Sequence, residues 1–207
     1  IAVLSKATNV LFLLPFVVWV IIGAARSRPL RLLGLAAVAV AMTLALNAGH
    51  MSRNRALYGS VLGVKGSQGV VNETFGLGVL ASNIVRNASL QLNTASDALN
   101  LEIARGIVRL HELVGLDASD PRTTFNQKFT VPPEWDHEET ASNQLHFVII
   151  IATTIAMTWR WRKEPATGYL WCVFAGAIIF CFYLKWHPWH TRLLLPLFMI
   201  TGAGIGA

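Results

Sequence analysis

Five long apolar runs constrain this chain more than any other feature, because each is long enough, or nearly so, to form a helix across a membrane. They cover residues 8–24, 32–48, 145–159, 167–184 and 193–207. The first run would span about 26 Å as a helix at about 1.5 Å per residue. The chain is 54% hydrophobic and only 14% charged, unlike an average soluble domain. The pattern predicts an all-α, polytopic membrane protein with about five transmembrane helices.

The first two runs are interpreted as a transmembrane hairpin, residues 1–46. A secretory signal peptide is the competing interpretation of the first run, but Lys6 is a poor positively charged leader and a second apolar run follows at once. The chain begins at Ile1 without an initiator Met and stops within an apolar run. We therefore expect a piece of a longer protein, truncated at both ends.

Residues 47–143 differ in character from the flanking runs. They carry eight basic and ten acidic residues, a balance of 8 − 10 = −2. Helical spacing of apolar residues predicts two helices, over 69–91 and over 97–114, the second with Asp97 as N-cap and Gly115 as its stop. This segment is expected to form a large, mainly helical loop domain between the second and third spans, with 144–207 forming spans three to five.

Charge in the short connections predicts the orientation of the spans. The 25–31 and 160–166 turns together hold six Lys or Arg residues and one acidic residue, so the positive-inside rule places both in the cytoplasm. The 47–143 loop and the 185–192 connection then face the extracytoplasmic side. The net charge of +6 is explained by these cytoplasmic flanks, and nucleic-acid binding is not implied.

The densest titratable cluster is Asp136, His137, Glu138 and Glu139, a few residues before the third span. His146 follows this cluster, at the start of that span. Adjacent like charges raise one another's pKa, which suits a carboxylate to act as a catalytic base near neutral pH. Oxygen and imidazole ligands would also suit a divalent metal, although no standard metal motif is present. The alternative is a solvated acidic cap for the following helix.

A second cluster lies between the last two spans. It contains Lys185, Trp186, His187, His190 and Arg192. A guanidinium at the start of a span can hold a phosphate bidentately while its stem lies along apolar surface. Lys185, His187 and His190 are further candidates for phosphate or lipid binding. The alternative for Arg192 is ordinary contact with phospholipid headgroups.

A third motif, Asp117 and Asp120, has the right chemistry for a cation, but its Asp-rich, Pro-containing sequence is more typical of a turn after a helix. We favour the turn. No metal site is assigned from this sequence.

The arrangement resembles the C-terminal portion of polytopic glycosyltransferases of the GT-C type, the group of the dolichyl-phosphate-mannose mannosyltransferases and the aminoarabinose transferases. The resemblance lies in the order of apolar hairpin, long loop and closely spaced spans, in the loop stretch from Asp117 to His146, and in the aromatic, basic connection that leads to Arg192-Leu-Leu-Leu-Pro196. The last is similar to an Arg-Tyr-x-x-Pro motif that opens a late span in that group.

The resemblance implies transfer of a sugar from a polyprenyl-phosphate donor to an acceptor on the extracytoplasmic side of a plasma membrane, a bacterial inner membrane in our interpretation. It carries over Arg192 as a phosphate ligand. That family places its catalytic carboxylate in the first outer loop, which has no counterpart here, so the main base is expected upstream of Ile1. The roles of Asp136, Glu138 and Glu139 as bases are a hypothesis made from the residues alone.

Two other functions stay open. One is a transferase like the O-antigen ligases, which would need no acidic base before Ile1. The other is a non-catalytic membrane scaffold or transporter subunit whose loop binds a partner. A transporter usually carries an ionisable residue or a Gly/Pro break in mid-span, and the spans here contain no charged interior residue.

Overall fold

The computed structural model describes residues 8–25, 29–61, 69–132 and 141–205. The chain divides into two compact units, Ile1–Gln68 and Gly69–Ala207. The described residues form helices joined by irregular segments, with two isolated bridges and no strand. The prediction of an all-α protein is confirmed.

The first unit is a pair of contacting helices, α2 (Asn9–Ala25) and α3 (Pro29–Tyr58). Helix α3 has 30 residues and continues past residue 48, where the second predicted apolar run ends. Polar side chains in this part of α3 form hydrogen bonds with groups one turn earlier in the same helix. Asn47 Nδ2 donates to Thr43 O at 2.7 Å, and Asn54 Nδ2 lies 3.2 Å from His50 Nε2. The helix therefore extends into the region expected to be loop.

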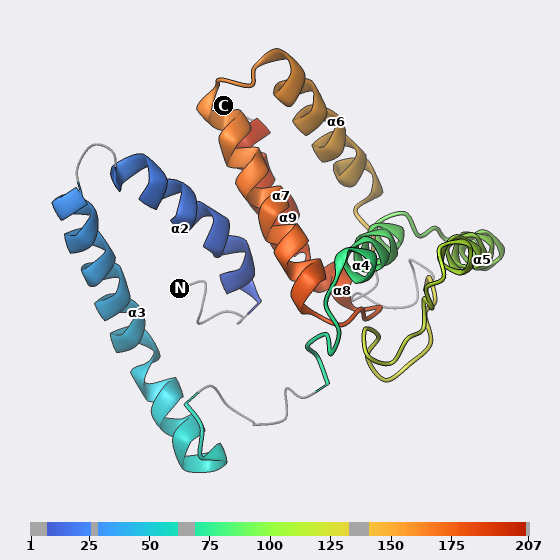
Figure 1. Cartoon of the computed structure of the whole chain (residues 1–207), viewed down its shortest axis with the longest axis horizontal. Helices are drawn as coiled ribbons and strands as arrows, with labels where there is room; N and C mark the ends of the chain where they lie inside the picture. The colour runs from blue at the N-terminus through green and yellow to red at the C-terminus, as the bar shows by residue number, and fades with distance from the viewer. Residues whose placement is uncertain (1–7, 26–28, 62–68, 133–140, 206–207) are drawn as a thin grey trace. The chain divides into compact units, whose positions relative to one another are not determined.

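The described residues of the second unit form six helices. They are α4 (Leu77–Leu90), α5 (Asp97–Leu113), α6 (Gln144–Arg160), α7 (Pro165–Tyr183), α8 (His190–Leu193) and α9 (Leu195–Ile205). Helix α7 packs against α9 and α6, while α4 contacts α7, α8 and α5. Figure 1 shows α6, α7 and α9 as a bundle, with α4 at one end and α5 beyond it.

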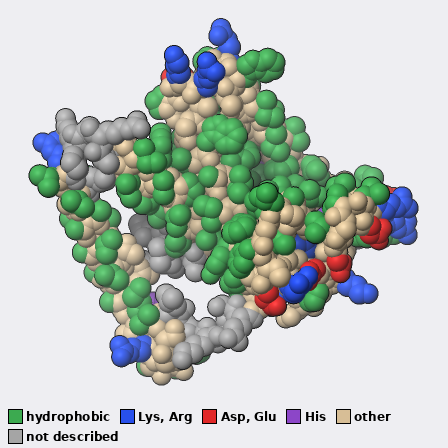
Figure 2. Space-filling view, in the orientation of Figure 1, with side chains coloured by type: hydrophobic (Ala, Val, Ile, Leu, Met, Phe, Trp, Pro, Cys, Tyr) green, Lys and Arg blue, Asp and Glu red, His purple; other side chains and the backbone are tan. Residues whose placement is uncertain are grey.

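Within the described parts of the chain, two helices are long and apolar enough to cross a membrane, Leu33–Tyr58 within α3 and Pro165–Tyr183, and a shorter apolar helix covers Val10–Gly23. Length and composition thus indicate association with a membrane. The five-span topology stays a prediction. Figure 2 shows Lys and Arg side chains at the end of the second unit where α6 meets α7, where Arg160, Arg162 and Lys163 are exposed, and apolar side chains over much of the bundle.

The start of α4 differs from the predicted 69–91 helix. Residues before Leu77 pair with the end of α7 instead: Asn72 N donates to Tyr183 O at 2.9 Å and Lys185 N donates to Val70 O at 2.9 Å. A segment whose backbone groups bond to another part of the chain cannot also form helical hydrogen bonds. Helix α4 therefore begins only at Leu77.

Helix α5 matches its predicted bounds, but its cap and its buried face differ. The N-cap is Ser96, whose Oγ accepts from Leu99 N, and Asp97 is the first helical residue. Gly115 ends the helix region with a φ of +71°, as expected for a glycine stop. The predicted apolar face is only half buried, because Leu99 and Leu110 are exposed while Asn100 and His111 are buried.

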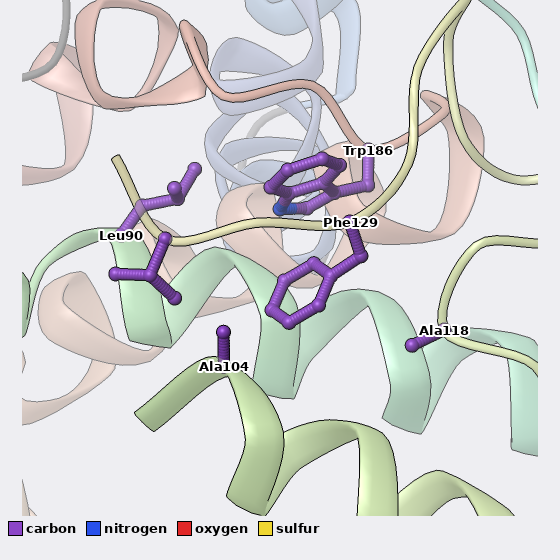
Figure 3. Packing of buried hydrophobic residues seen from close by; sticks show 6 residues of the cluster. Leu90, Ala104, Ala118, Phe129 and Trp186 are labelled. Carbon is purple, nitrogen blue, oxygen red and sulfur yellow. The ribbon is translucent and has the colours of Figure 1, made fainter. Parts of the chain in front are cut away.

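A small apolar core joins the loop domain to the connection that follows α7. Its buried members are Leu90, Ala104, Ala118, Phe129, Val131 and Trp186. Trp186 is fully buried, and its ring meets Phe129 edge-on with centroids 4.9 Å apart (Figure 3). Aromatic pairs in this geometry contribute about 1 kcal/mol beyond their buried area. Trp186, a residue of the predicted site cluster, is thus part of this core.

Candidate functional site

The candidate site is built on a polar face of α4. Asn83, Arg86 and Asn87 stand three and four residues apart, so they share one side of the helix. All three are buried, Asn83 and Arg86 completely. Buried polar groups need hydrogen-bond partners to offset their lost hydration. The partners come from the 118–124 segment and from the chain that follows α7.

Arg86 is held by neutral oxygens. Its Nη1 donates to Ala118 O at 2.7 Å and to Thr124 Oγ1 at 2.6 Å, and its Nη2 donates to Asn83 Oδ1 at 2.5 Å and to Thr123 Oγ1 at 3.1 Å. Among the residues that the structure describes, no carboxylate forms an ion pair with this guanidinium. The positive charge is therefore solvated by the protein's own dipoles.

The charge on Arg86 persists despite its burial. Burial lowers the pKa of Arg86 to about 10, and the carboxylates of Asp120 and Asp117 act in the opposite direction from farther away. The guanidinium carbon also lies 5.9 Å from the centre of the Trp186 ring, within range of a cation–π contact. With a pKa of about 10, Arg86 stays protonated at neutral pH.

The connection between α7 and α8 is fastened to this layer by its backbone. Trp186 N donates to Thr123 O at 2.8 Å, and Lys185 N donates to Val70 O at 2.9 Å. Isolated bridges pair Thr124 with Trp186 and Val71 with Leu184. Residues 70–71 and 123–124 thus hold the backbone of residues 184–186, where the predicted site cluster begins.

Lys185 is buried within this arrangement. Its Nζ donates to Glu73 Oε1 at 2.6 Å and to Pro121 O at 2.7 Å. The Lys185 side chain is 6% exposed and that of Glu73 is 61% exposed. The ammonium group expected to bind phosphate is therefore engaged within the protein, where it ties the connection to the loop domain.

His190 is also buried, at the start of α8. Its Nδ1 lies 2.8 Å from Asn87 Oδ1, and its ring meets Phe180 edge-on at 4.8 Å. Asn87 Nδ2 donates to Asn83 O, which leaves its oxygen facing His190, so Nδ1 carries the proton and donates. Burial, followed by the nearby charges of His187 and Arg86, lowers the pKa of His190 well below its usual value. The ring is neutral at physiological pH.

His187 lies between two aromatic rings. Its ring centroid is 4.0 Å from that of Trp189 and 5.2 Å from that of Phe125. Trp189 N donates to His187 Nδ1 at 3.2 Å, so this nitrogen accepts and the other ring nitrogen carries the proton of the neutral form. His187 is half buried and its orientation is fixed.

Arg192 differs from the other three candidates of this cluster, Lys185, His187 and His190, because it is exposed. It lies in α8, three residues before the start of α9, and both Thr191 before it and Leu194 between the two helices are buried. The backbone of Leu194 donates to His190 O at 2.8 Å. A short helix thus holds the exposed Arg192 three residues before an apolar helix.

The Asp117 and Asp120 motif forms turns, as favoured from sequence. Asp117 Oδ1 accepts from Ser119 N at 2.7 Å, and Asp120 Oδ1 accepts from Arg122 N at 2.8 Å. Asp120 also binds the Arg122 side chain, with Arg122 Nη2 2.7 Å from Asp120 Oδ2. This hydrogen bond lowers the pKa of Asp120. Both carboxylates therefore have structural partners.

The predicted acidic cluster is not among the residues that the structure describes. Asp136, His137, Glu138 and Glu139 lie outside the described residues. His146 lies in the first turn of α6 and is exposed. Within the ranges that the structure describes, no group of three or more His, Cys, Asp or Glu side chains is placed to hold a metal ion.

The polar face of α4 was missed by the sequence analysis. Asn83, Arg86 and Asn87 lie among the apolar residues whose spacing predicts this helix. Their spacing of three and four residues would have revealed them, because polar residues at this spacing share one face of a helix just as apolar residues do. Their partners Thr123 and Thr124 carry no such periodicity.

Comparison of this chain with known protein families, with curated proteins and with solved structures finds no match.

Proposed function

We propose that this chain belongs to an integral membrane glycosyltransferase that moves a sugar from a polyprenyl-phosphate donor to an acceptor hydroxyl on the extracytoplasmic side. The observation that carries the proposal is the exposed Arg192 in α8, three residues before the apolar helix α9 begins. A lipid-linked sugar phosphate has its anionic group where its hydrocarbon begins. A guanidinium at the same depth binds that group bidentately.

The surroundings of Arg192 support this role. Affinity for a phosphate improves when the binding group is presented by a rigid element, because less conformational freedom is lost on binding. The chain around Arg192 is fixed by the buried His190 and by the Lys185 ion pair. We therefore assign Lys185 and His190 positioning roles, and Arg192 the phosphate contact, with His187 beside it in the same connection.

The proposed reaction needs one base and one stabilised leaving group. A carboxylate removes the proton from the acceptor hydroxyl, whose oxygen forms a bond to the anomeric carbon of the sugar. The bond from that carbon to the phosphate oxygen breaks, and the electron pair leaves with polyprenyl phosphate, inverting the carbon. Arg192 stabilises the charge that develops on the phosphate. Asp136, Glu138 and Glu139 are the proposed bases within this chain.

The test is sugar transfer in membranes from cells that express the full protein, with radiolabelled polyprenyl-phosphate sugars as donors. We expect a labelled product that is absent from membranes without the protein. Asp136→Asn, Glu138→Gln and Glu139→Gln, made one at a time, ask whether the base lies here, since loss of a general base lowers the rate by about 10²–10⁴-fold. Arg109→Ala, on the exposed side of α5, is the control. Absence of transfer with every donor tried would favour the scaffold interpretation.

A further inference from the structure

A pocket of about 530 Å³ lies at the turn between α6 and α7, where Figure 2 shows exposed Lys and Arg side chains. It is lined by consecutive residues of that turn: Trp159, Arg160, Trp161, Arg162, Lys163 and Glu164. All six are exposed, the two tryptophans to 87% and 52%. The lining thus holds three cations and one carboxylate, and among the described residues no ion pair joins them. The pocket therefore has a net positive charge that is accessible to an anion.

The turn is held in place by hydrogen bonds to the two helices that it joins. Thr167, buried in the first turn of α7, donates from its Oγ1 to Trp161 O at 2.7 Å. Trp161 N donates to Met157 O at 2.8 Å. Farther from the turn, Trp171 Nε1 of α7 donates to Thr158 Oγ1 of α6 at 3.0 Å. The backbone that carries the cations is therefore fixed, so little of it has to be ordered when an anion binds.

A second, apolar pocket of about 370 Å³ adjoins the first between α6 and α7. It is lined by Ile151, Thr154, Ile155, Thr158, Trp159, Trp171 and Phe174. Trp159 lines both pockets, which makes them neighbours. The lining residues of α6 recur every three or four positions, so they follow one side of that helix for about 12 Å at about 1.5 Å per residue. The pocket is accessible, because Ile155 and Trp171 are 60% and 49% exposed.

The position of the turn along α7 indicates what surrounds the two pockets. Helix α7 begins at Pro165, directly after the turn, and is long and apolar enough to cross a membrane. Its 19 residues extend about 28 Å, close to the ~30 Å thickness of a hydrocarbon core. The turn then lies at a membrane surface, where tryptophans and cations are favoured, and the apolar pocket beside α7 lies among lipid chains.

This site is separate from the proposed phosphate contact. The turn precedes α7, whereas the connection that holds Arg192 follows it, so the two lie at opposite ends of this helix. A ligand at the turn is therefore not the sugar donor held at Arg192.

We propose that the two adjoining pockets form a binding site for one anionic glycerophospholipid. The headgroup phosphate binds at Arg160, Arg162 and Lys163, and one acyl chain lies in the apolar pocket between α6 and α7. Charge selects the occupant, because the cations attract an anionic headgroup and repel the cationic part of a zwitterionic one. The inference rests on the membrane location of α7 and not on a transfer reaction, so it holds or fails independently of the proposed function.

The experiment is photo-crosslinking of the full protein in micelles of a neutral detergent. The probe is a phosphatidylglycerol with a diazirine in its acyl chain, and labelled peptides are mapped by mass spectrometry. We expect labels on α6 within residues 151–159 and on Trp171 and Phe174 of α7. Unlabelled phosphatidylglycerol should displace this label at a concentration about tenfold lower than phosphatidylcholine with the same acyl chains.

A variant with a neutral turn tests the headgroup contact. Labelling of the pocket should fall about tenfold or more when three substitutions are combined, Arg160→Gln, Arg162→Gln and Lys163→Gln. The matched control removes two arginines and one lysine from exposed positions elsewhere in the second unit and should keep the wild-type labelling: Arg105→Gln, Arg109→Gln and Lys128→Gln.

A second pair of variants tests the acyl-chain contact. Ile155→Asn places a polar amide in the apolar pocket at an exposed position and should lower labelling there severalfold. Ile149→Asn makes the same change at an exposed position of α6 that lines neither pocket, and it should leave labelling unchanged.

Melting temperatures in the same detergent identify any variant that does not fold, and the competition between the two unlabelled lipids needs no substitution. Pocket labelling that phosphatidylglycerol displaces better than phosphatidylcholine, and that is lost in the variant with the neutral turn, supports the site. Equal displacement by the two lipids overturns it. So does labelling that is spread evenly over the helices, or that is unchanged in the folded variant with the neutral turn.

Discussion

The Nδ1 atom of His190 lies 2.8 Å from the side-chain oxygen of Asn87, and both residues are buried. This bond joins α4 to the short helix α8 that carries Arg192. Through Asn87 and Asn83 it also continues to Arg86, since Asn87 Nδ2 donates to Asn83 O and Arg86 Nη2 donates to Asn83 Oδ1. The proposed phosphate ligand is therefore positioned by a polar layer that a loop helix supplies.

The bond between His190 and Asn87 should appear as coupling between their substitutions. We expect Asn87→Leu and His190→Phe each to destabilise the protein by about 1–3 kcal/mol, because each leaves a buried polar partner unsatisfied. The double variant should cost less than the sum, by about 1 kcal/mol, since both partners are then removed. Thermal unfolding in detergent measures this cycle. Additive effects would mean that the two side chains do not interact.

Stability should fall as the pH decreases below about 6.5, the usual pKa of histidine. Burial lowers the pKa of His190 in the folded protein, so below that usual value the unfolded chain binds a proton that the folded protein does not. Protonation therefore favours unfolding from about pH 6.5 downward, until the folded-state pKa is reached. The melting temperature of wild type between pH 8 and pH 5 measures this dependence.

The His190→Phe variant is the control for this pH dependence, because it lacks the group that titrates. Its melting temperature should change less over the same range. The lowered pKa of Asp120 acts in a separate window, because its stabilising effect is lost only as the pH falls below about 3.8. Equal slopes in wild type and His190→Phe between pH 8 and pH 5 would contradict the account.

Arg86 should be required for stability through its hydrogen bonds as well as its charge. Arg86→Met leaves several buried oxygens without donors and should cost roughly 2–4 kcal/mol. Arg86→Lys keeps the charge but not the planar donor geometry and should remain clearly destabilised. Arg109→Ala, at an exposed position, should change stability by less than about 0.5 kcal/mol. Wild-type stability in Arg86→Lys would show that charge alone is sufficient.

The two residues of the Lys185–Glu73 ion pair should contribute unequally to stability. Lys185 is 6% exposed, and Lys185→Met removes a buried donor from both Glu73 and Pro121 O, for an expected loss of about 1–3 kcal/mol. Glu73 is 61% exposed, so Glu73→Gln should cost only about 0.2–1 kcal/mol. Unfolding in detergent compares the two. A larger effect at Glu73 than at Lys185 would contradict this reading of the contact.

The sequence predicts Asp97 as the N-cap of α5, whereas the structure has Ser96 in that position. Ser96→Ala removes the side-chain oxygen that accepts from Leu99 N and should cost about 1 kcal/mol. Asp97→Ala removes a favourable charge from the first helical turn and should cost about 0.3–1 kcal/mol, which is less than the capping loss. The reverse order would restore Asp97 as the cap.

Helices with strong apolar periodicity or clear stop signals could be predicted. The all-α class, the bounds of α5 and the stop at Gly115 follow from local pattern and from glycine's tolerance of positive φ. The start of α4 could not, because residues 69–72 pair with residues more than a hundred positions away. Local propensity contains no information about such partners.

The candidate site, too, could be predicted from the sequence only in part. The residues at 185–192 were identified as a cluster from their composition and their place between apolar runs. Their different states could not be predicted: Lys185, Trp186 and His190 are buried, while Arg192 is exposed. Which side chain of a cluster is buried depends on what packs against it, and that surface comes from α4 and the 118–131 segment.

The central claim is that Arg192 binds the phosphate of a lipid-linked sugar. The most direct measurement is the donor-concentration dependence of sugar transfer by the full protein in membranes, for wild type, Arg192→Ala, Arg192→Lys and the control Arg109→Ala. We predict that Arg192→Ala lowers kcat/KM about 100-fold or more at an unchanged melting temperature, because a donor to the developing charge is lost. Arg192→Lys should recover part of that loss, because an ammonium keeps the charge without the bidentate geometry. Transfer by Arg192→Ala at the wild-type rate would contradict the account.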